Sequence, residues 1–367
     1  MSHRASRILR RTVFFLIVGL LLCGAGVFAA VKLKDLRQSG LSLYALPADP
    51  GRVYEAKDGL MTIQNGMLVR LNAQAEPLFS AELEDGSAKA CGNAELTAVY
   101  HGPTLRIYDN NGTLLVQHTL ETEILDMVMG DESYAVLFQQ DGQKRVSVYR
   151  TDTTPLDENI LFPYQSVLDL DLFDGDRQLW TLSLDVHSTQ PVSMIKTRNV
   201  GLTTTASLSV DGEIVYGTAP YKGGFVTVGT QTMKVWDSKG TETFSQMIYG
   251  WILQDMEEDS KGRIQCIFCP ADPEGSGVKT MLWYIRLEAD GTTTQYRYSL
   301  PADTLAVCLT DRDIAAVTTS QLVRMPCQGG RTDSLDLSVQ VSSVQVLENS
   351  HGLILRSGDQ EYLLKLD

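Results

Sequence analysis

Short apolar segments follow one another along the chain from residue 41 onward, and polar turns separate them. Residues 60–63 lead through a tight turn to residues 67–71, and residues 353–355 lead in the same way to residues 362–366. Segments of this length between turn residues are typical of β-strands. No long stretch of this region has the period of an amphipathic helix, so we expect an all-β fold.

The strand pairs recur at a nearly regular spacing. Comparable pairs begin near residues 60, 96, 134, 179, 225, 263, 314 and 352, at intervals of 36 to 51 residues. Two further short strands fit into each interval. A period of about 40–50 residues with four strands per unit is typical of a β-propeller. One such sheet cannot bury both of its faces alone, so the units must pack side by side to make a continuous core.

Dipeptides that favour tight hairpin turns recur between the segments. Asp-Gly begins at Asp58, Asp85, Asp141, Asp174, Asp211 and Asp290, and Asn-Gly begins at Asn65 and Asn111. These dipeptides accept the positive φ angles that two-residue hairpin loops require. Their number supports many short antiparallel strands.

The repeat region is incomplete at both ends. Residues 43–46 and 52–55 have the character of strands and precede the first unit, whereas the last unit stops after two strands. Pairing the two chain ends in one sheet would complete an eighth blade and remove open strand edges, which promote aggregation. We therefore predict one β-propeller over residues 41–367, with eight blades favoured and seven as the alternative.

An uncharged segment of 20 residues, long enough to cross a bilayer as a helix, precedes this domain at residues 12–31. Its large apolar residues are Val13, Phe14, Phe15, Leu16, Ile17, Val18, Leu20, Leu21, Leu22, Val27 and Phe28. We expect a short basic tail at 1–11, a transmembrane helix at 12–31 and a juxtamembrane linker at 32–40. The alternatives are a signal peptide cleaved after Ala29 and a lipoprotein modified at Cys23. The apolar run is longer than the roughly 7–15 residues of a signal peptide, which favours the anchor.

Basic residues flank the apolar segment on both sides. They are Arg4, Arg7, Arg10 and Arg11 before it and Lys32, Lys34 and Arg37 after it. The flank with more positive charge stays in the cytoplasm, and a very short N-terminus before one apolar segment is usual for an anchored exported domain. We therefore expect a single-pass protein of the cell membrane with its propeller outside the cytoplasm.

The charge of the expected exported part is strongly negative. Residues 1–37 hold seven of the 31 basic residues and one of the 45 acidic residues, so the remaining chain carries 24 basic and 44 acidic residues, a net charge of −20. A surface of this sign repels phosphate groups, so we expect no nucleic-acid partner and no docking on anionic lipid. Solubility alone is a sufficient reason for such a charge.

The cysteines do not form a recognisable framework. Five lie beyond the apolar segment with irregular spacing, and only a pair such as Cys308 with Cys327 stays open as a disulfide. Cys266 and Cys269 form a C-x-x-C motif, but they lie within a β-branched and aromatic run rather than at the start of a helix. Strand alternation would send their thiols to opposite faces, so we expect core residues rather than a redox or zinc site.

Acidic residues cluster at two places without a metal-ligand pattern. The first cluster comprises Asp169, Asp171, Asp174 and Asp176, and the second comprises Asp255, Glu257, Glu258 and Asp259. A calcium loop that began at Asp169 would place Phe173 and Trp180 at ligand positions, so the pattern fails. We expect a strand with Leu inward and Asp outward for the first cluster and a solvated hairpin tip for the second. The histidines are scattered, and we expect no metal, no cofactor and no catalytic residue.

Aromatic residues recur near the ends of the predicted strands. They are Tyr108, Tyr149, Trp236, Trp283 and Tyr284. Aromatic side chains at these positions would line a sugar site if they were exposed, but repeated aromatics at one position of a repeat are typical of packing between repeats. We expect packing between blades.

Two features resemble known propellers. Trp236-Asp237 after Met233-Lys234-Val235 resembles the end of a WD-repeat strand, and residues 108–112 are similar to it. The whole layout, with a basic N-terminus, one anchor and an exported propeller, is similar to an uncharacterised membrane-anchored β-propeller family of Clostridia-type Firmicutes. No activity is assigned to that family, so the resemblance implies no functional residue.

These expectations favour a non-enzymatic, membrane-tethered propeller that binds a protein partner, or acts as a scaffold, at the cell envelope. Binding would use loops on one face of the disc, and the longest candidates are residues 185–205 and 270–280. The alternative is an extracytoplasmic receptor for a glycan or small molecule, or a glycan-active enzyme, at the mouth of the central channel. A purely structural spacer is a third hypothesis.

Overall fold

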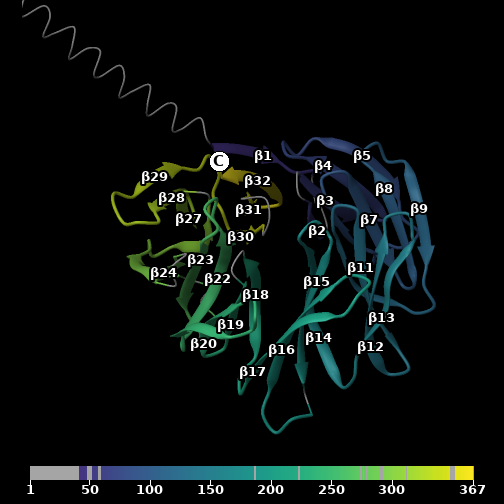
Figure 1. Cartoon of the computed structure of the whole chain (residues 1–367). Helices are drawn as coiled ribbons and strands as arrows, with labels where there is room; N and C mark the ends of the chain where they lie inside the picture. The colour runs from purple at the N-terminus through teal and green to yellow at the C-terminus, as the bar shows by residue number, and fades with distance from the viewer. Residues whose placement is uncertain are drawn as a thin grey trace, which may run out of the picture.

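The protein folds into eight four-stranded antiparallel sheets packed side by side in a ring, the architecture of an eight-bladed β-propeller (Figure 1). The computed structural model describes residues 41–47, 52–56, 59–185, 187–221, 224–272, 275, 277, 279–288, 292–310, 312–347 and 352–366. These residues contain strands and turns and no helix. The predicted all-β propeller and the preference for eight blades are confirmed.

The first four blades each take their strands in chain order. Blade 1 contains β2 (Arg52–Ala56), β3 (Gly59–Gln64), β4 (Met67–Asn72) and β5 (Pro77–Glu82). Blade 2 contains β6 (Lys89–Gly92), β7 (Leu96–His101), β8 (Thr104–Asp109) and β9 (Leu114–Thr119). Blade 3 contains β10 (Ile124–Met129), β11 (Ser133–Gln140), β12 (Gln143–Arg150) and β13 (Pro155–Phe162). Blade 4 contains β14 (Gln165–Phe173), β15 (Gln178–Asp185), β16 (Val192–Asn199) and β17 (Thr204–Asp211).

The next three blades repeat this order, and the last blade combines both ends of the chain. Blade 5 contains β18 (Val215–Tyr221), β19 (Gly224–Gly229), β20 (Thr232–Asp237) and β21 (Glu242–Met247). Blade 6 contains β22 (Trp251–Glu258), β23 (Ile264–Pro270), β24 (Met281–Leu287) and β25 (Thr293–Ser299). Blade 7 contains β26 (Thr304–Leu309), β27 (Asp313–Thr318), β28 (Gln321–Pro326) and β29 (Asp333–Asp336). Blade 8 contains β30 (Ser343–Val346), β31 (Gly352–Ser357), β32 (Gln360–Leu366) and β1 (Leu41–Ala45).

Blade 8 closes the ring. Its fourth strand is β1, which runs antiparallel to β32 with Leu41 opposite Leu366 and Ala45 opposite Tyr362, so that it lies beside the C-terminus (Figure 1). The predicted pairing of the chain ends is therefore confirmed, but its division differs. The C-terminal part supplies three strands rather than two, and residues 52–56 form the first strand of blade 1.

The predicted repeat starts coincide within one residue with the second strand of each blade. These second strands lie inside their sheets, with a neighbouring blade on each face, so they are buried almost throughout and read as continuous apolar runs. The first strands of neighbouring blades contact one another and surround the central axis, as β2 contacts β6 and β22 contacts β26. Their mixed composition explains why the sequence pattern placed each first strand at the end of the preceding unit.

Eight hydrophobic clusters hold the blades together, one at each of the eight interfaces between neighbouring blades. The cluster between blades 8 and 1 contains Leu46, Leu347, Ile354 and Leu363 from one blade and Leu60, Leu71 and Ala75 from the other. Burying a large aliphatic side chain contributes about 1.5–3 kcal/mol. The core of the protein is therefore distributed around the ring rather than gathered at one centre.

Tight hairpin turns occur at several of the predicted dipeptides, whereas Asp85-Gly86 and Asp211-Gly212 lie in connections between blades. Asn65, Asp141 and Asp174 have φ angles of 50°, 52° and 56°, and each precedes a glycine that also has a positive φ. This conformation is uncommon for residues other than glycine, and Asn and Asp tolerate it best. Hairpin loops of this type match the twist of the strands that they connect.

The antiparallel order gives the disc two distinct faces. Turns between first and second strands and between third and fourth strands lie on one face, and the chain ends at Leu41 and Leu366 lie there too. We call this the chain-end face. Turns between second and third strands and the connections from blade to blade lie on the opposite face, which we call the far face.

The predicted membrane helix at 12–31 lies outside the described residues. The same holds for Arg4, Arg7, Arg10 and Arg11 and for the juxtamembrane linker at 32–40. No helix within the described part of the chain is long and apolar enough to span a bilayer.

Removal of β1 should destabilise the ring. A variant that lacks residues 1–46 loses β1 and the buried Leu46, whereas a variant that lacks residues 1–40 keeps both. We expect the shorter variant to unfold at least about 5 °C below the longer one, because it leaves one edge of β32 unpaired and exposes the cluster between blades 8 and 1. Thermal unfolding followed by circular dichroism measures the difference, and equal midpoints would show that β1 does not close the ring.

Candidate functional site

The C-x-x-C motif is part of the core, as predicted. Cys266 packs in the cluster between blades 5 and 6, and Cys269 packs in the cluster between blades 6 and 7. Burial raises the pKa of the Cys269 thiol to about 11 and also raises the pKa of Cys266. Only the thiolate is a nucleophile or a metal ligand, so these protonated thiols are poor candidates for redox chemistry. Cys308 and Cys327 are both free thiols, so the open disulfide pairing is not present.

The first acidic cluster follows the predicted pattern. Leu170 and Leu172 on β14 are buried, whereas Asp169 and Asp171, which alternate with them, are exposed. Partial desolvation raises the pKa of Asp171 to about 6, and the negative charge of Asp176 adds to the effect. The Asp176 carboxylate accepts hydrogen bonds from the backbone N–H groups of residues 131, 132 and 133 in a turn of the preceding blade. This cluster therefore joins blade 4 to blade 3.

The predicted hairpin tip at the second acidic cluster is wrong for three of its four residues. Asp255, Glu257 and Glu258 lie within β22, the first strand of blade 6, and only Asp259 lies in the turn that follows. Asp259 is not solvated either, because its side chain is 7% exposed and pairs with Arg263. The strand assignment failed because β22 carries a polar second half, which reads as a turn in sequence.

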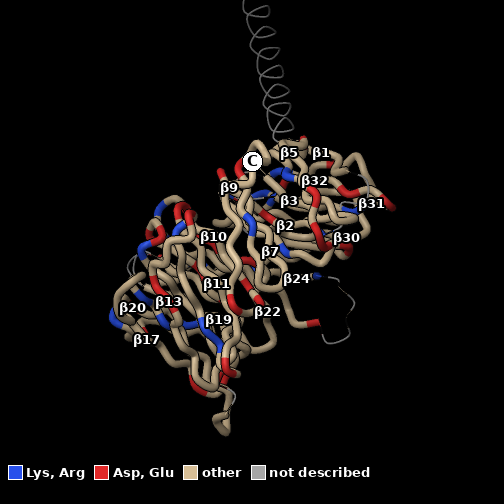
Figure 2. The backbone as a smooth tube through the Cα atoms, turned by 90° about the vertical axis from the view of Figure 1, so that its right-hand side faces the viewer, with Lys and Arg blue, Asp and Glu red and all other residues tan. Residues whose placement is uncertain are grey.

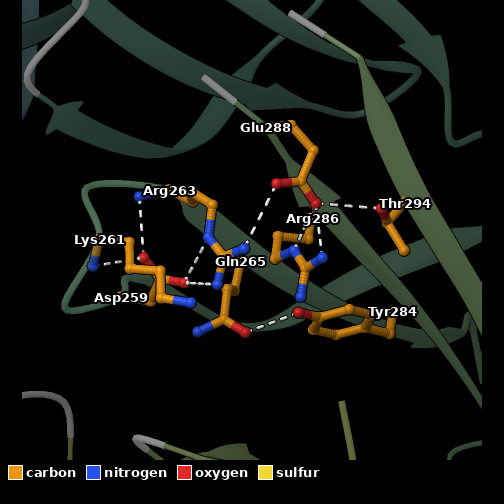
Figure 3. A network of polar contacts seen from close by, with 8 residues as sticks. All are labelled: Asp259, Lys261, Arg263, Gln265, Tyr284, Arg286, Glu288 and Thr294. Atoms are coloured by element: carbon orange, nitrogen blue, oxygen red, sulfur yellow. Dashed lines mark hydrogen bonds and ion pairs between the residues drawn. The ribbon is translucent and has the colours of Figure 1, made fainter. Parts of the chain in front are cut away.

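Asp259 belongs to a polar network between the second and third strands of blade 6 (Figure 3). Arg263 bridges Asp259 and Glu288, with its Nη1 3.4 Å from Glu288 Oε2. Arg286 donates to Glu288 Oε1 at 2.7 Å, and the Thr294 hydroxyl donates to the same oxygen at 3.0 Å. Each carboxylate of this network has an arginine partner, so its charges are internally balanced. The arrangement fits a structural role at the chain-end face.

The first strands, which lie nearest the centre of the ring, are rich in carboxylates. The described first strands carry seven acidic residues and two basic residues. Three of the acids, Asp126, Asp169 and Asp255, follow a β-bulge at the same position of their blades, and each accepts the N–H of the next residue. The first strands are thus acidic, and part of that charge fastens the bulges.

The histidines and acids do not form a metal-binding group within the described part of the chain. His118 packs against Tyr134, with its Nδ1 2.7 Å from the tyrosine hydroxyl. His101 pairs with Asp85 at 3.1 Å across the far face of blades 1 and 2. These two histidines join neighbouring strands and blades.

The repeated aromatic residues lie in the interfaces between blades, as predicted. Tyr108, Tyr149, Trp236, Trp283 and Tyr284 are all at most 8% exposed and all belong to inter-blade clusters. They therefore do not form a sugar-stacking surface.

The two predicted binding loops are only partly loops. Residues 192–199 form β16, so the predicted segment 185–205 reduces to a far-face loop after Asp185 and a turn on the other face. The described residues of the predicted segment 270–280 begin at the end of β23 and lie on the far face. Its Ala271 N–H donates to the Gly250 carbonyl oxygen at 2.8 Å, which joins it to the connection between blades 5 and 6.

Exposed apolar side chains gather on the far face from blade 4 to blade 6. Seven of them lie in its turns or within two residues of a strand end there: Tyr164, Ile214, Tyr216, Met247, Tyr249, Ile252 and Met281. We call this set the apolar rim. Tyr249 is the most exposed of these, at 77%. Large apolar side chains gathered on one surface mark an interaction site more often than isolated ones do.

Hydrogen bonds from blade to blade hold the apolar rim in place. The Leu253 N–H donates to the Tyr216 hydroxyl oxygen at 3.1 Å, which links the first strands of blades 5 and 6. The buried Glu213, next to Ile214, accepts the N–H groups of Gln231 and Thr232 at 2.9 and 3.0 Å. The rim is thus set on a rigid scaffold, as binding residues on propeller loops require.

Tyr164 begins the apolar rim at the connection between blades 3 and 4. Its ring packs edge-on against the His187 ring, with 5.6 Å between the ring centres, so the far-face loop of blade 4 supports Tyr164. Charged residues of both signs are interspersed along the blades (Figure 2). The apolar rim is therefore distinguished from its surroundings by its apolar residues and not by a concentration of positive or negative charge.

No protein-family model matches the chain, and no curated protein matches it in sequence. Solved structures do match. They include the WD40 domain of SCAP from fission yeast, with a TM-score of 0.62 and 10% identity over 89% of this chain and 98% of that one. BamB from Moraxella catarrhalis is similar with a TM-score of 0.54 and 12% identity over 89% and 97%. Saccharomyces cerevisiae Sqt1 is similar with a TM-score of 0.56 and 9% identity over 89% and 98%. These likenesses show a WD40-like propeller fold.

Loss of the Glu213 carboxylate should loosen the far face. Glu213→Ala leaves the two N–H groups and the Thr232 hydroxyl without their acceptor, and we expect a loss of about 2–4 kcal/mol in the free energy of unfolding. Urea denaturation measures it. Glu123, an exposed glutamate in the corresponding connection of blade 2, is the control, and Glu123→Ala should change stability by about 0.5 kcal/mol or less. Similar losses in the two variants would contradict the role of Glu213.

Proposed function

We propose that this chain is a membrane-tethered β-propeller that binds a protein partner at the outer side of the cell membrane, without catalysis. The apolar rim is the observation that carries the proposal. Its residue types, tyrosine, methionine and isoleucine, include those that are enriched at the centres of protein interfaces. A WD40-like fold supports an interaction scaffold in general terms.

The position of the chain ends suits such a tether. A helix at residues 12–31 and a linker at 32–40 would join the disc at Leu41, which lies on the chain-end face beside β32. The apolar rim lies on the far face. A disc held in this way presents its rim away from the bilayer, where a partner in the envelope can reach it.

Other features of the structure agree with binding rather than catalysis. The buried thiols stay protonated at neutral pH, and the arginine–carboxylate network of blade 6 is internally paired. The net charge of −20 beyond residue 37 disfavours nucleic acid as a partner. The layout of a basic N-terminus, an anchor and a propeller also supports kinship with the uncharacterised anchored propellers of Clostridia-type Firmicutes.

A photo-cross-linking amino acid at position 249 should capture the partner. We expect a discrete cross-linked product when the probe replaces Tyr249 in the full-length chain within its native membrane, and mass spectrometry identifies the protein. Leu202 is the matched control, because it is 65% exposed but lies on the chain-end face. Equal products from the two positions, or none from position 249, would count against the far face as the binding surface.

Once the partner is purified, Tyr249→Ala should weaken its binding at least about 30-fold, as expected for an interface hot spot of 2 kcal/mol or more. Leu202→Ala should leave the dissociation constant within about twofold. Surface plasmon resonance with both variants gives the comparison.

The proposed topology can be tested at the C-terminus. A reporter enzyme that is active only outside the cytoplasm, fused after Asp367, should be active in intact cells. The same reporter fused before Arg4 should be inactive. Activity confined to a cytoplasmic reporter at Asp367 would exclude the proposed orientation.

A further inference from the structure

The flank of the disc contains a cavity of about 260 Å³ between blades 3 and 4. One wall is β13, the outer strand of blade 3, which contributes Glu158, Ile160 and Leu161. The opposite wall is the sheet of blade 4, which contributes Lys196 and Arg198 from β16. The volume is below the roughly 300–1,000 Å³ of sites for drug-sized ligands, so it suits a group of about one amino acid in size. The cavity is distinct from the apolar rim.

The cavity exists because one repeat position departs from the pattern of the ring. The residue near the end of the third strand that faces the preceding blade is apolar and buried in seven blades: Leu71, Tyr108, Tyr149, Trp236, Leu287, Met325 and Leu364. In blade 4 this position is Arg198. Its partner on the second strand is Leu179, just as Phe225 is the partner of Trp236. A polar side chain thus occupies the position that a buried apolar side chain fills at the other seven interfaces.

Arg198 is held by a carboxylate from the neighbouring blade. Its Nε lies 2.5 Å and its Nη2 3.1 Å from the two oxygens of Asp157, which is almost buried. Asp157 also accepts the N–H of Gly201 at 3.1 Å. The charge of Arg198 is therefore balanced and its guanidinium is fixed in place, since paired donors hold a planar fork to one geometry.

Lys196 is the cation of the cavity without a carboxylate partner among the described residues. Its Nζ lies 5.7 Å from the centre of the Phe162 ring, which forms part of the cavity and is buried. The cation–π contact holds the ammonium group on the wall without neutralising it. Lys196 and Arg198 are two residues apart on β16, so both side chains lie on the face of the sheet that lines the cavity.

These charges select one kind of ligand. One unbalanced ammonium group calls for a single negative charge, and a carboxylate accepts hydrogen bonds from a lysine and from an arginine at once. Glu158 at the wall adds a negative charge that repels a doubly charged phosphate. Ile160 and Leu179, both in the apolar cluster between blades 3 and 4, offer an apolar surface for a side chain.

From this geometry we propose that the cavity between blades 3 and 4 binds a carboxylate carried by an apolar group of about one residue in size, as found in a free amino acid or in the C-terminal residue of a peptide. Lys196 binds the carboxylate and Arg198 orients it. The proposal does not depend on the apolar rim, so each stands or fails by its own test.

Isothermal titration calorimetry on the full-length chain in detergent tests this assignment. The probes are L-leucine, the dipeptide alanyl-leucine, the C-terminal amide of that dipeptide, and inorganic phosphate. We expect leucine, the dipeptide or both to bind, and the amide and phosphate not to bind. Binding of leucine indicates a free amino acid as the ligand, and binding of the dipeptide alone indicates a peptide C-terminus.

Lys196→Met keeps the aliphatic stem over Phe162 and removes the charge, so it should weaken binding about 10- to 100-fold. The matched control is Lys234→Met, because Lys234 occupies the same repeat position in blade 5, with its Nζ 5.7 Å from the centre of the Trp236 ring. That variant should bind like the unmodified chain. Three results would overturn the assignment: no binding of either carboxylate probe, equal binding of the amide or of phosphate, or binding that Lys196→Met leaves unchanged.

Discussion

A sheet of four short strands leaves two apolar faces uncovered, and the burial of those faces against the next sheet is the interaction on which this protein depends. Each blade gains its core only from its neighbours, so stability rises when the last interface forms and falls when any interface is missing. The strand β1 therefore has more influence than its five residues suggest. It completes blade 8, and Leu46 just after it completes the cluster between the last blade and the first.

Because apolar contacts close every interface, polar groups are free to differ from blade to blade. Glu213 and Asp176 use carboxylates to join the turns of neighbouring blades. Arg198, paired with Asp157, instead takes the place of a buried apolar side chain, and a cavity lies beside this ion pair. The repeated apolar positions thus form the core of the propeller, and the blades that depart from the repeat carry the candidate binding surfaces.

The sequence alone predicts the frame well because the second and third strands are covered on both faces and read as apolar runs. It predicts β14 from the alternation of Leu and Asp, but it misreads β22, whose polar second half and bulge resemble a turn. The apolar rim and the cavity escape prediction for another reason: they assemble residues from separate blades, and Asp157 and Arg198 are 41 positions apart. One signal was present, because Arg198 stands where other units carry an aromatic or aliphatic residue. Finding it requires the units to be aligned strand by strand, which the displaced repeat boundaries prevented.

The pairing of β1 with β32 has a mechanical consequence. Any load that reaches the disc through the residues before Leu41 pulls along the axis of β1, so the ladder to β32 is loaded in shear. Shear stretches all rungs of the ladder together, whereas peeling would break them one at a time. A pull strong enough to detach β1 would open the disc at blade 8 and expose the interface between the first and last blades.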